Sequence, residues 1–315
     1  MTRWFKNFFW LLKQAGVEFG EDHATKLSAS LAYFTIFSIG PLLLVIITIL
    51  GFVYKKATVT AEVFDRVSSV IGKSGASALH NILNNMSRQT HTTLIGTIGI
   101  LVFIFGATTI FSEIQTSINY IWSVKAKPKR SWLKYIIDRL ISLLLVVIMG
   151  FIMMITIVAN VVIDLIAGRL HHLLGDAEIV LLKGANFGVL FLIVTLVFTI
   201  IFRVLPDARI HLKDAIVGAV FTSVLFLIGK FLISYYLGFA KSLNAYGAAT
   251  SIILLLTWIY YCAMILYYGA EFTEVYAKKY GHGITVSKNA VHIFKHEAQI
   301  QTLKHQDSAP GKKGA

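Results

Sequence analysis

Residues 184–202 read GANFGVLFLIVTLVFTIIF, nineteen residues without a charge between Lys183 and Arg203. At a rise of 1.5 Å per residue, such a helix is about 28 Å long, close to the ~30 Å hydrocarbon core of a bilayer. Five further runs are comparably apolar, and Lys230 is the one charge inside them: residues 28–54, 92–112, 140–163, 215–240 and 242–270. The sequence therefore predicts an all-α, polytopic membrane bundle of about six transmembrane helices.

The composition of the whole chain agrees with a membrane protein. Of its 315 residues, 56% are hydrophobic and 14% are charged, and the mean hydropathy is +0.71. Soluble domains carry about a quarter charged residues, so this chain lacks the polar surface that a soluble fold needs. A single cysteine, Cys262, excludes an intramolecular disulfide. The basic start is not followed by a short apolar run with a cleavage site, so we expect no cleavable signal peptide.

The basic residues lie between the apolar runs and predict the orientation of the chain. Lys and Arg number 20 in residues 1–27, 125–139, 203–214 and 271–315, against 9 in the connections assigned to the other side. The positive-inside rule places the richer side, and with it both termini, in the cytoplasm of a bacterial inner membrane. The net charge of +13 is explained by this orientation, and we expect no nucleic acid partner.

The polar segments outside the spans divide the chain into three parts. Residues 1–27 form an N-terminal segment in which residues 3–14 alternate aromatic and basic side chains, the pattern of a helix lying in the membrane interface. Residues 28–280 form the transmembrane domain, with residues 55–91 as an external amphipathic loop. Residues 281–315 are polar and are expected to be a disordered cytoplasmic tail.

A polar stripe runs along the second predicted helix. Thr108, Ser112, Gln115 and Asn119 follow one another at spacings of four, three and four, which places them on one helical face. Thr116 flanks this face and Glu113 lies beside it. Because polar side chains avoid lipid, the stripe serves either as interhelical hydrogen bonding or as the wall of a polar pathway to the cytoplasm.

Four charged residues end or interrupt the apolar runs. Glu113, Arg203 and Glu271 lie near the predicted cytoplasmic face, where Arg203 would either bridge the carboxylates or reach interfacial water. Lys230 falls about 23 Å along the fifth helix, toward the outer leaflet. There it either extends to the interface or meets an anionic group such as a lipid phosphate.

Gly40 and Pro41 lie near the middle of the first predicted span. Proline removes an internal hydrogen bond and kinks a helix. Such a kink serves packing or, in transporters, lines a substrate site.

Sequence signatures of enzymes are absent. There is no HExxH, GxSxG, Walker or Rossmann pattern, so we expect no catalytic residues, no metal site and no cofactor. A ribonuclease would need a cluster of acids and histidines. The candidates Asp138, Asp207 and Asp214 would then have to meet in one pocket with nearby histidines.

Several short motifs resemble the YihY/BrkB family of bacterial inner-membrane proteins over roughly residues 8 to 280. The motifs are LAYF at 31–34, GPLL at 40–43, NYIW at 119–122, RVLPDA at 203–208, Gly218-Ala, Lys230, Tyr236, Tyr246-Gly, Trp258 and GAE at 269–271. One departure is His211, where many members have tryptophan. The resemblance implies six helices with both termini cytoplasmic. It brings a ribonuclease label that looks misassigned, a virulence label and a suspected role in moving lipids.

The leading hypothesis is a non-enzymatic transporter or flippase-like protein for an amphiphilic or anionic envelope component, with membrane lipids as partners. Its polar pathway would comprise Thr108, Ser112, Glu113, Gln115, Thr116, Asn119, Arg203, Lys230 and Glu271. The alternative is a structural, envelope-integrity protein whose polar residues only pack helices. A ribonuclease is the third and least supported reading.

Overall fold

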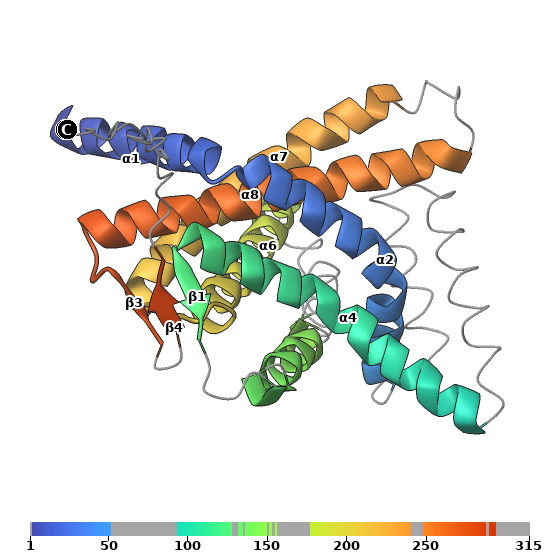
Figure 1. The fold of residues 1–315 in the computed structure, drawn as a ribbon. Coiled ribbons are helices and arrows are strands. Elements are labelled where there is room, and N and C mark those ends of the chain that lie inside the picture. The colour runs from blue at the N-terminus through green and yellow to red at the C-terminus, as the bar shows by residue number, and fades with distance from the viewer. Residues whose placement is uncertain are drawn as a thin grey trace, which may run out of the picture.

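The computed structural model describes residues 2–51, 93–127, 132–134, 136–149, 151–152, 155, 177–240, 248–287 and 290–293. Over these residues the chain is mostly helical (Figure 1). The helices are α1 (Thr2–Glu21), α2 (Ala24–Gly51), α4 (Thr93–Ile121), α6 (Ala177–Val204), α7 (Leu212–Ala240) and α8 (Ala248–Lys279). Residues 136–149 are also helical. Four short strands are β1 (Val124–Ala126), β2 (Ala208–Ile210), β3 (Ile284–Val286) and β4 (Ala290–His292).

Apart from α1, the helices coincide with the apolar runs, so the predicted helical fold is confirmed. Phe187–Val204 in α6 and Leu212–Leu232 in α7 are long and apolar enough to cross a membrane, in a search limited to the described residues. The external loop 55–91 and most of the third run after residue 152 lie outside the described residues. The number of six spans therefore stays a prediction.

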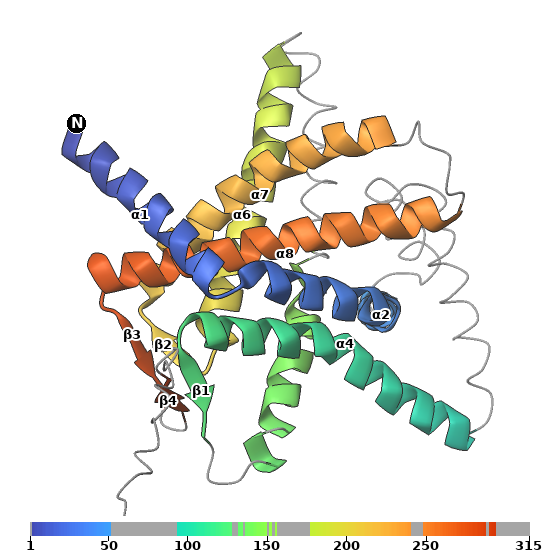
Figure 2. The ribbon, with the colours of Figure 1, turned by 45° about the horizontal axis from the view of Figure 1, so that its top comes forward.

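Helix α8 is the central helix of the bundle and contacts α1, α2, α4 and α7. Figures 1 and 2 show the four strands gathered at one end of the bundle, beside the end of α8. Strand β1 follows α4, β2 joins α6 to α7, and β3 follows α8. The C-terminal ends of α4 and α6 and the N-terminal end of α7 therefore lie at this end of the bundle as well. The distribution of Lys and Arg predicts that these helix ends face the cytoplasm.

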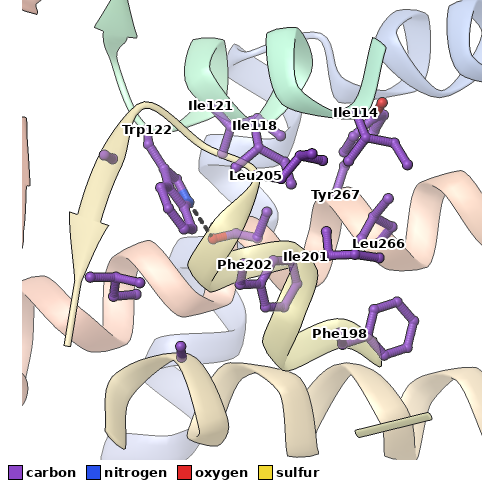
Figure 3. Close-up of a cluster of buried hydrophobic side chains, with 14 of the residues drawn as sticks. Ile114, Ile118, Ile121, Trp122, Phe198, Ile201, Phe202, Leu205, Leu266 and Tyr267 are labelled. Carbon is purple, nitrogen blue, oxygen red and sulfur yellow. Dashed lines mark hydrogen bonds between the residues drawn. The ribbon is translucent and has the colours of Figure 1, made fainter. Parts of the chain in front are cut away.

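The largest buried cluster lies where α4, α6 and α8 meet near the strands (Figure 3). Ile118, Phe202 and Tyr267 have no exposed surface, and Trp122 is 1% exposed. The indole N–H of Trp122 donates to the carbonyl oxygen of Ala270 at 3.1 Å. This bond satisfies a polar group that would be costly to bury unpaired, and it joins the end of α4 to α8.

Helices α7 and α8 approach closely through glycines. A Cβ atom built on Gly218 would lie 2.8 Å from the Cβ of Thr273, and one built on Gly269 would lie 2.9 Å from the Cβ of Thr222. Each helix thus offers a glycine to a threonine of the other. Small residues allow such close backbone approach in membrane bundles, where dispersion contacts replace the hydrophobic effect between helices.

Helix α1 packs along α8 and keeps an apolar edge exposed. Leu11 and Ala15 are buried, and the hydroxyl of Tyr268 donates to the carbonyl oxygen of Leu12 at 2.9 Å. Phe5 and Phe9 are 62% and 70% exposed. A helix with one apolar edge docked and another exposed suits the predicted interfacial position.

Two segments at the start of the C-terminal tail are ordered, which corrects the expectation of disorder for residues 284–287 and 290–293. Strand β3 pairs antiparallel with β2, and β4 pairs antiparallel with β1. The backbone N–H of Ile293 donates to the carbonyl oxygen of Ser123 at 2.8 Å. The segment is ordered because its backbone finds partners in two strands that precede it by about 80 and 170 residues, a feature that local polarity does not report. Residues 294–315 lie outside the described residues.

Helix α2 continues through Gly40 and Pro41 without a break. Its ribbon changes direction in its second half, as both views show (Figures 1 and 2). A change of direction is what a proline within a helix produces, because it removes one backbone hydrogen bond.

Candidate functional site

A cavity of about 560 Å³ lies at the strand end of the bundle. Its walls come from α4, β1, the helix 136–149, the connection between α6 and β2, and the end of β4. It is lined by Ser112, Gln115, Thr116, Asn119, Tyr120, Val124, Lys125, Ala126, Asp138, Arg139, Asp207 and Ile293.

Three residues of the predicted polar stripe, together with the flanking Thr116, line one wall of this cavity. Ser112, Gln115, Thr116 and Asn119 all belong to α4, and their helical spacing turns them to the same side. Thr108, one turn earlier, is fully buried and does not line the cavity.

Asp207 is the centre of a hydrogen-bond network at the cavity wall. Its Oδ2 atom accepts from Asn119 Nδ2 at 2.9 Å and from Gln115 Nε2 at 3.4 Å. Its backbone N–H donates to Asn119 Oδ1 at 2.8 Å. The stripe on α4 is thereby joined to the connection after α6, so Gln115 and Asn119 hold segments together while they line the cavity.

Lys134 pairs with both carboxylates at the cavity. Its ammonium donates to Asp138 Oδ1 at 2.5 Å and also pairs with Asp207. Burial by itself lowers the pKa of Lys134, but the hydrogen bonds to Asp138 and Asp207 outweigh burial and raise that pKa above its usual value. Lys134 therefore stays protonated at physiological pH, and its ammonium joins the stretch that carries Lys134 and Asp138 to the connection after α6.

Arg139 is held against the polar stripe of α4. Its Nη1 atom donates to Ser112 Oγ at 2.9 Å, and Nη2 donates to Thr109 Oγ1 at 3.4 Å. Lys125 is exposed in β1, at the start of the densest basic block of the chain. With Lys134, the charged side chains described at the cavity are three cations and two carboxylates, so the site carries a positive balance.

The other predicted pathway residues lie away from this cavity. Glu113 accepts a hydrogen bond from Ser30 Oγ of α2 at 2.5 Å. Arg203 and Lys230 are exposed. Glu271 is fully buried. Among the described residues, no ion pair joins Arg203 to Glu113 or Glu271, so the bridge considered for Arg203 is not formed there.

Glu271 instead lies in an acidic group near the end of α8. Carboxylate oxygens of Glu18, Glu271 and Glu274 lie within 4.8 Å of one another. Lys278 pairs with Glu274 at 2.7 Å. Although burial lowers the pKa of Lys278, the surrounding carboxylates raise it, Glu274 most of all.

Several residues of the cavity were not predicted from the sequence. Lys125, Arg139 and Ile293 line it, and Lys134 lies beside it. Arg139 directly precedes the third apolar run, and this position was the only signal for it in the sequence. Ile293 had no such signal, since its place depends on the pairing of β4 with β1.

The acids considered for a ribonuclease do not all meet. Asp138 and Asp207 line the cavity, but Asp214 is not among its lining residues. Asp214 accepts a hydrogen bond from the backbone N–H of His282 at 3.0 Å. The ring of His282 stacks on that of His211, with centroids 4.2 Å apart. The convergence that a ribonuclease site required is therefore absent among the described residues.

Comparisons with known proteins agree with the architecture. The family described as Virulence factor BrkB matches residues 15–293. A Bacillus subtilis protein named as ribonuclease-like, YfkH, is 26% identical over 258 residues, covering 80% of this chain and 90% of that protein. A UPF0761 membrane protein of Aliivibrio salmonicida is 25% identical over 304 residues, covering 94% and 91% of the two chains. One of Vibrio campbellii is 25% identical over 260 residues, covering 79% and 76%. No solved structure matches.

Proposed function

The chain belongs to the virulence factor BrkB family of membrane proteins, and we propose that it moves an anionic amphiphile of the bacterial envelope across the cytoplasmic membrane. The observation that carries this proposal is the cavity of about 560 Å³, whose wall is the polar stripe of α4. A volume of several hundred Å³ is typical of sites that take up small molecules.

The lining of the cavity suits a molecule with a polar head and an apolar tail. Ser112, Thr116 and Arg139 supply polar groups, whereas Val124 and Ile293 are apolar. Polar side chains inside an apolar bundle are costly unless they are paired or serve a substrate. The positive balance of the described charges favours an anionic head.

The proposal includes a topology of six spans with both termini in the cytoplasm. It is supported by the six apolar runs and by the 20-to-9 division of Lys and Arg. On this topology the cavity opens on the cytoplasmic side, next to Lys125 and Lys127. The substrate would enter there with its head group first.

A cavity-filling substitution tests the proposal. We expect Thr116→Trp to slow transport of a labelled anionic lipid in liposomes about tenfold or more, because an indole occupies space that the head group needs. Thr116 Oγ1 bonds only the Ser112 carbonyl of its own helix among the hydrogen bonds seen for it, at 2.9 Å. Its loss should therefore leave folding intact.

Thr257→Trp is the matched control for this experiment. Thr257 makes the same type of bond, to the carbonyl oxygen of Ile253 at 2.8 Å, and it does not line the cavity. Its transport rate should stay within about twofold of the wild type, as for surface substitutions in general. Equal loss in both variants, or wild-type liposomes no faster than empty ones, would refute the proposal.

A structural role is the second candidate, and the Asp207 network favours it. Gln115 and Asn119 are both hydrogen-bonded to Asp207, which is the arrangement of residues that hold helices together. A purely structural protein would move no lipid in liposomes, while substitutions at Asp207 would still lower its stability.

We further propose that the chain does not hydrolyse RNA. Asp138 and Asp207 share Lys134 as their ion-pair partner, which makes them poor ligands for a catalytic metal. Cleavage of RNA by the purified protein that disappears in Asp207→Asn would contradict this.

A further inference from the structure

Hydrogen-bond donors reach the cavity from more than one wall. Arg139 lies on the helix 136–149, and its guanidinium is oriented by the hydroxyls of Ser112 and Thr109. Lys125 lies on β1, and Tyr120 presents a hydroxyl-bearing side chain from α4. A ligand in the cavity would thus meet cationic and neutral donors that are not in one plane.

The carboxylates at the cavity do not prevent an anionic ligand from binding there. Asp138 and Asp207 both pair with Lys134, and Asp207 also accepts from Asn119 and Gln115. Lys134 compensates one of these two negative charges, and Arg139 with Lys125 brings two further positive charges, so the described groups keep a positive balance.

We infer that the cavity binds the phosphate group of its amphiphile through Arg139 and Lys125, an inference that rests on the proposed transport of an anionic amphiphile. A phosphate presents three or more acceptor oxygens in a tetrahedral arrangement, whereas a carboxylate presents two in a plane. Donors on separate walls match the tetrahedral group better. The guanidinium of Arg139, a planar fork of N–H donors held by Ser112 and Thr109, supplies a delocalised positive charge, and Lys125 supplies a point charge.

The size of the cavity separates a phosphate ester from free phosphate. About 560 Å³ is far more than a phosphate group fills, and the apolar side chains of Val124, Ala126 and Ile293 complete the lining. The remaining space and this apolar surface suit the glycerol or sugar to which the phosphate is esterified, together with the start of an acyl chain.

Calorimetric titration of the full chain, purified in a detergent without phosphate, tests this inference. The probes are dihexanoyl phosphatidic acid, a dihexanoyl glycerol that carries a carboxylate instead of the phosphate, and inorganic phosphate. We expect the phosphatidic acid to bind about tenfold more tightly than either comparison, because it alone combines the tetrahedral set of acceptor oxygens with a part that fills the apolar lining.

Substitutions at Arg139 and Lys125 test whether these two residues contact the phosphate. Arg139→Gln and Lys125→Gln should each weaken phosphatidic acid binding about tenfold, and Arg139→Lys about threefold to fivefold, since the charge remains without the fork. Arg209→Gln, an exposed residue of β2 outside the cavity lining, is the matched control and should change affinity by less than about twofold. Lys125 is exposed, so its variant keeps the test decisive if Arg139→Gln does not fold.

The possible results separate the inference from the proposed function. Equal binding of the carboxylate probe overturns the phosphate inference and leaves transport of an anionic amphiphile standing. If inorganic phosphate binds as tightly as phosphatidic acid, the inference that the cavity takes a phosphate ester is wrong. Arg139-dependent binding of phosphatidic acid by a protein that moves no lipid in liposomes supports the site and overturns the transport function.

Discussion

Asp207→Ala is expected to lower the free energy of unfolding by about 3 kcal/mol, since it leaves the mostly buried Lys134 with Asp138 alone and removes the acceptor of two further hydrogen bonds. Lys134 and Asp207 are only 16% and 14% exposed, so water replaces little of the lost interaction. The two hydrogen bonds come from Asn119 and Gln115. Thermal unfolding of the detergent-solubilised protein, followed by tryptophan fluorescence, measures the loss.

Two further variants identify the cause of that loss. Asp207→Asn keeps an acceptor oxygen but removes the charge, so its effect should be about half as large. Glu21→Ala removes a charge from an exposed residue at the end of α1 and should change stability by less than about 0.5 kcal/mol. If Asp207→Ala is no more destabilising than Glu21→Ala, the network is not what joins α4 to the connection after α6.

Gly218→Ala is expected to destabilise the protein by about 2–3 kcal/mol through overpacking. Its new Cβ would lie 2.8 Å from the Cβ of Thr273, closer than two carbon atoms can pack. Because this position is inside the interface of α7 and α8, the helices would have to separate and lose contacts along their length. The same thermal unfolding measurement reports the effect.

The matched control is Gly188→Ala in α6, where a Cβ atom would meet nothing within 4 Å. This variant should be neutral or slightly stabilising, since alanine is favoured over glycine in helices by about 1 kcal/mol. The exchange Gly218→Ala with Thr273→Gly should recover part of the stability, because it removes the overlapping side chain. Similar stability of Gly218→Ala and Gly188→Ala would contradict the close approach of the two helices.

The two interpretations of the polar stripe on α4 are compatible in the folded protein. Gln115 and Asn119 donate hydrogen bonds to Asp207, as residues that pack helices together do. Ser112 accepts from Arg139, and Thr116 bonds only within α4 in the part described, so both can turn toward a ligand in the cavity. One face of α4 therefore has both roles. Some of its side chains bind neighbouring segments and others line the cavity, because side chains one turn apart meet different neighbours.

Much of the helical architecture could be read from local pattern. The run at 184–202 lies within α6, and the spacing of Ser112, Gln115 and Asn119 placed them on one face of α4. Both predictions depend on backbone periodicity and on the free energy of transferring apolar residues out of water, which are properties of neighbouring residues.

The meeting of distant segments was decided only by the tertiary structure. Lys134 and Asp207 are 73 residues apart, and Asn119 and Asp207 are 88 apart. The pairing of β4 with β1, which ordered a segment expected to be disordered, also joins residues far apart in the chain. The local sequence around an aspartate or a short polar segment does not indicate its partner, because the packing of whole helices determines which groups meet. The apolar run at 184–202 thus determines that α6 exists and can cross a membrane, and packing determines that the turn after it closes a charged cavity.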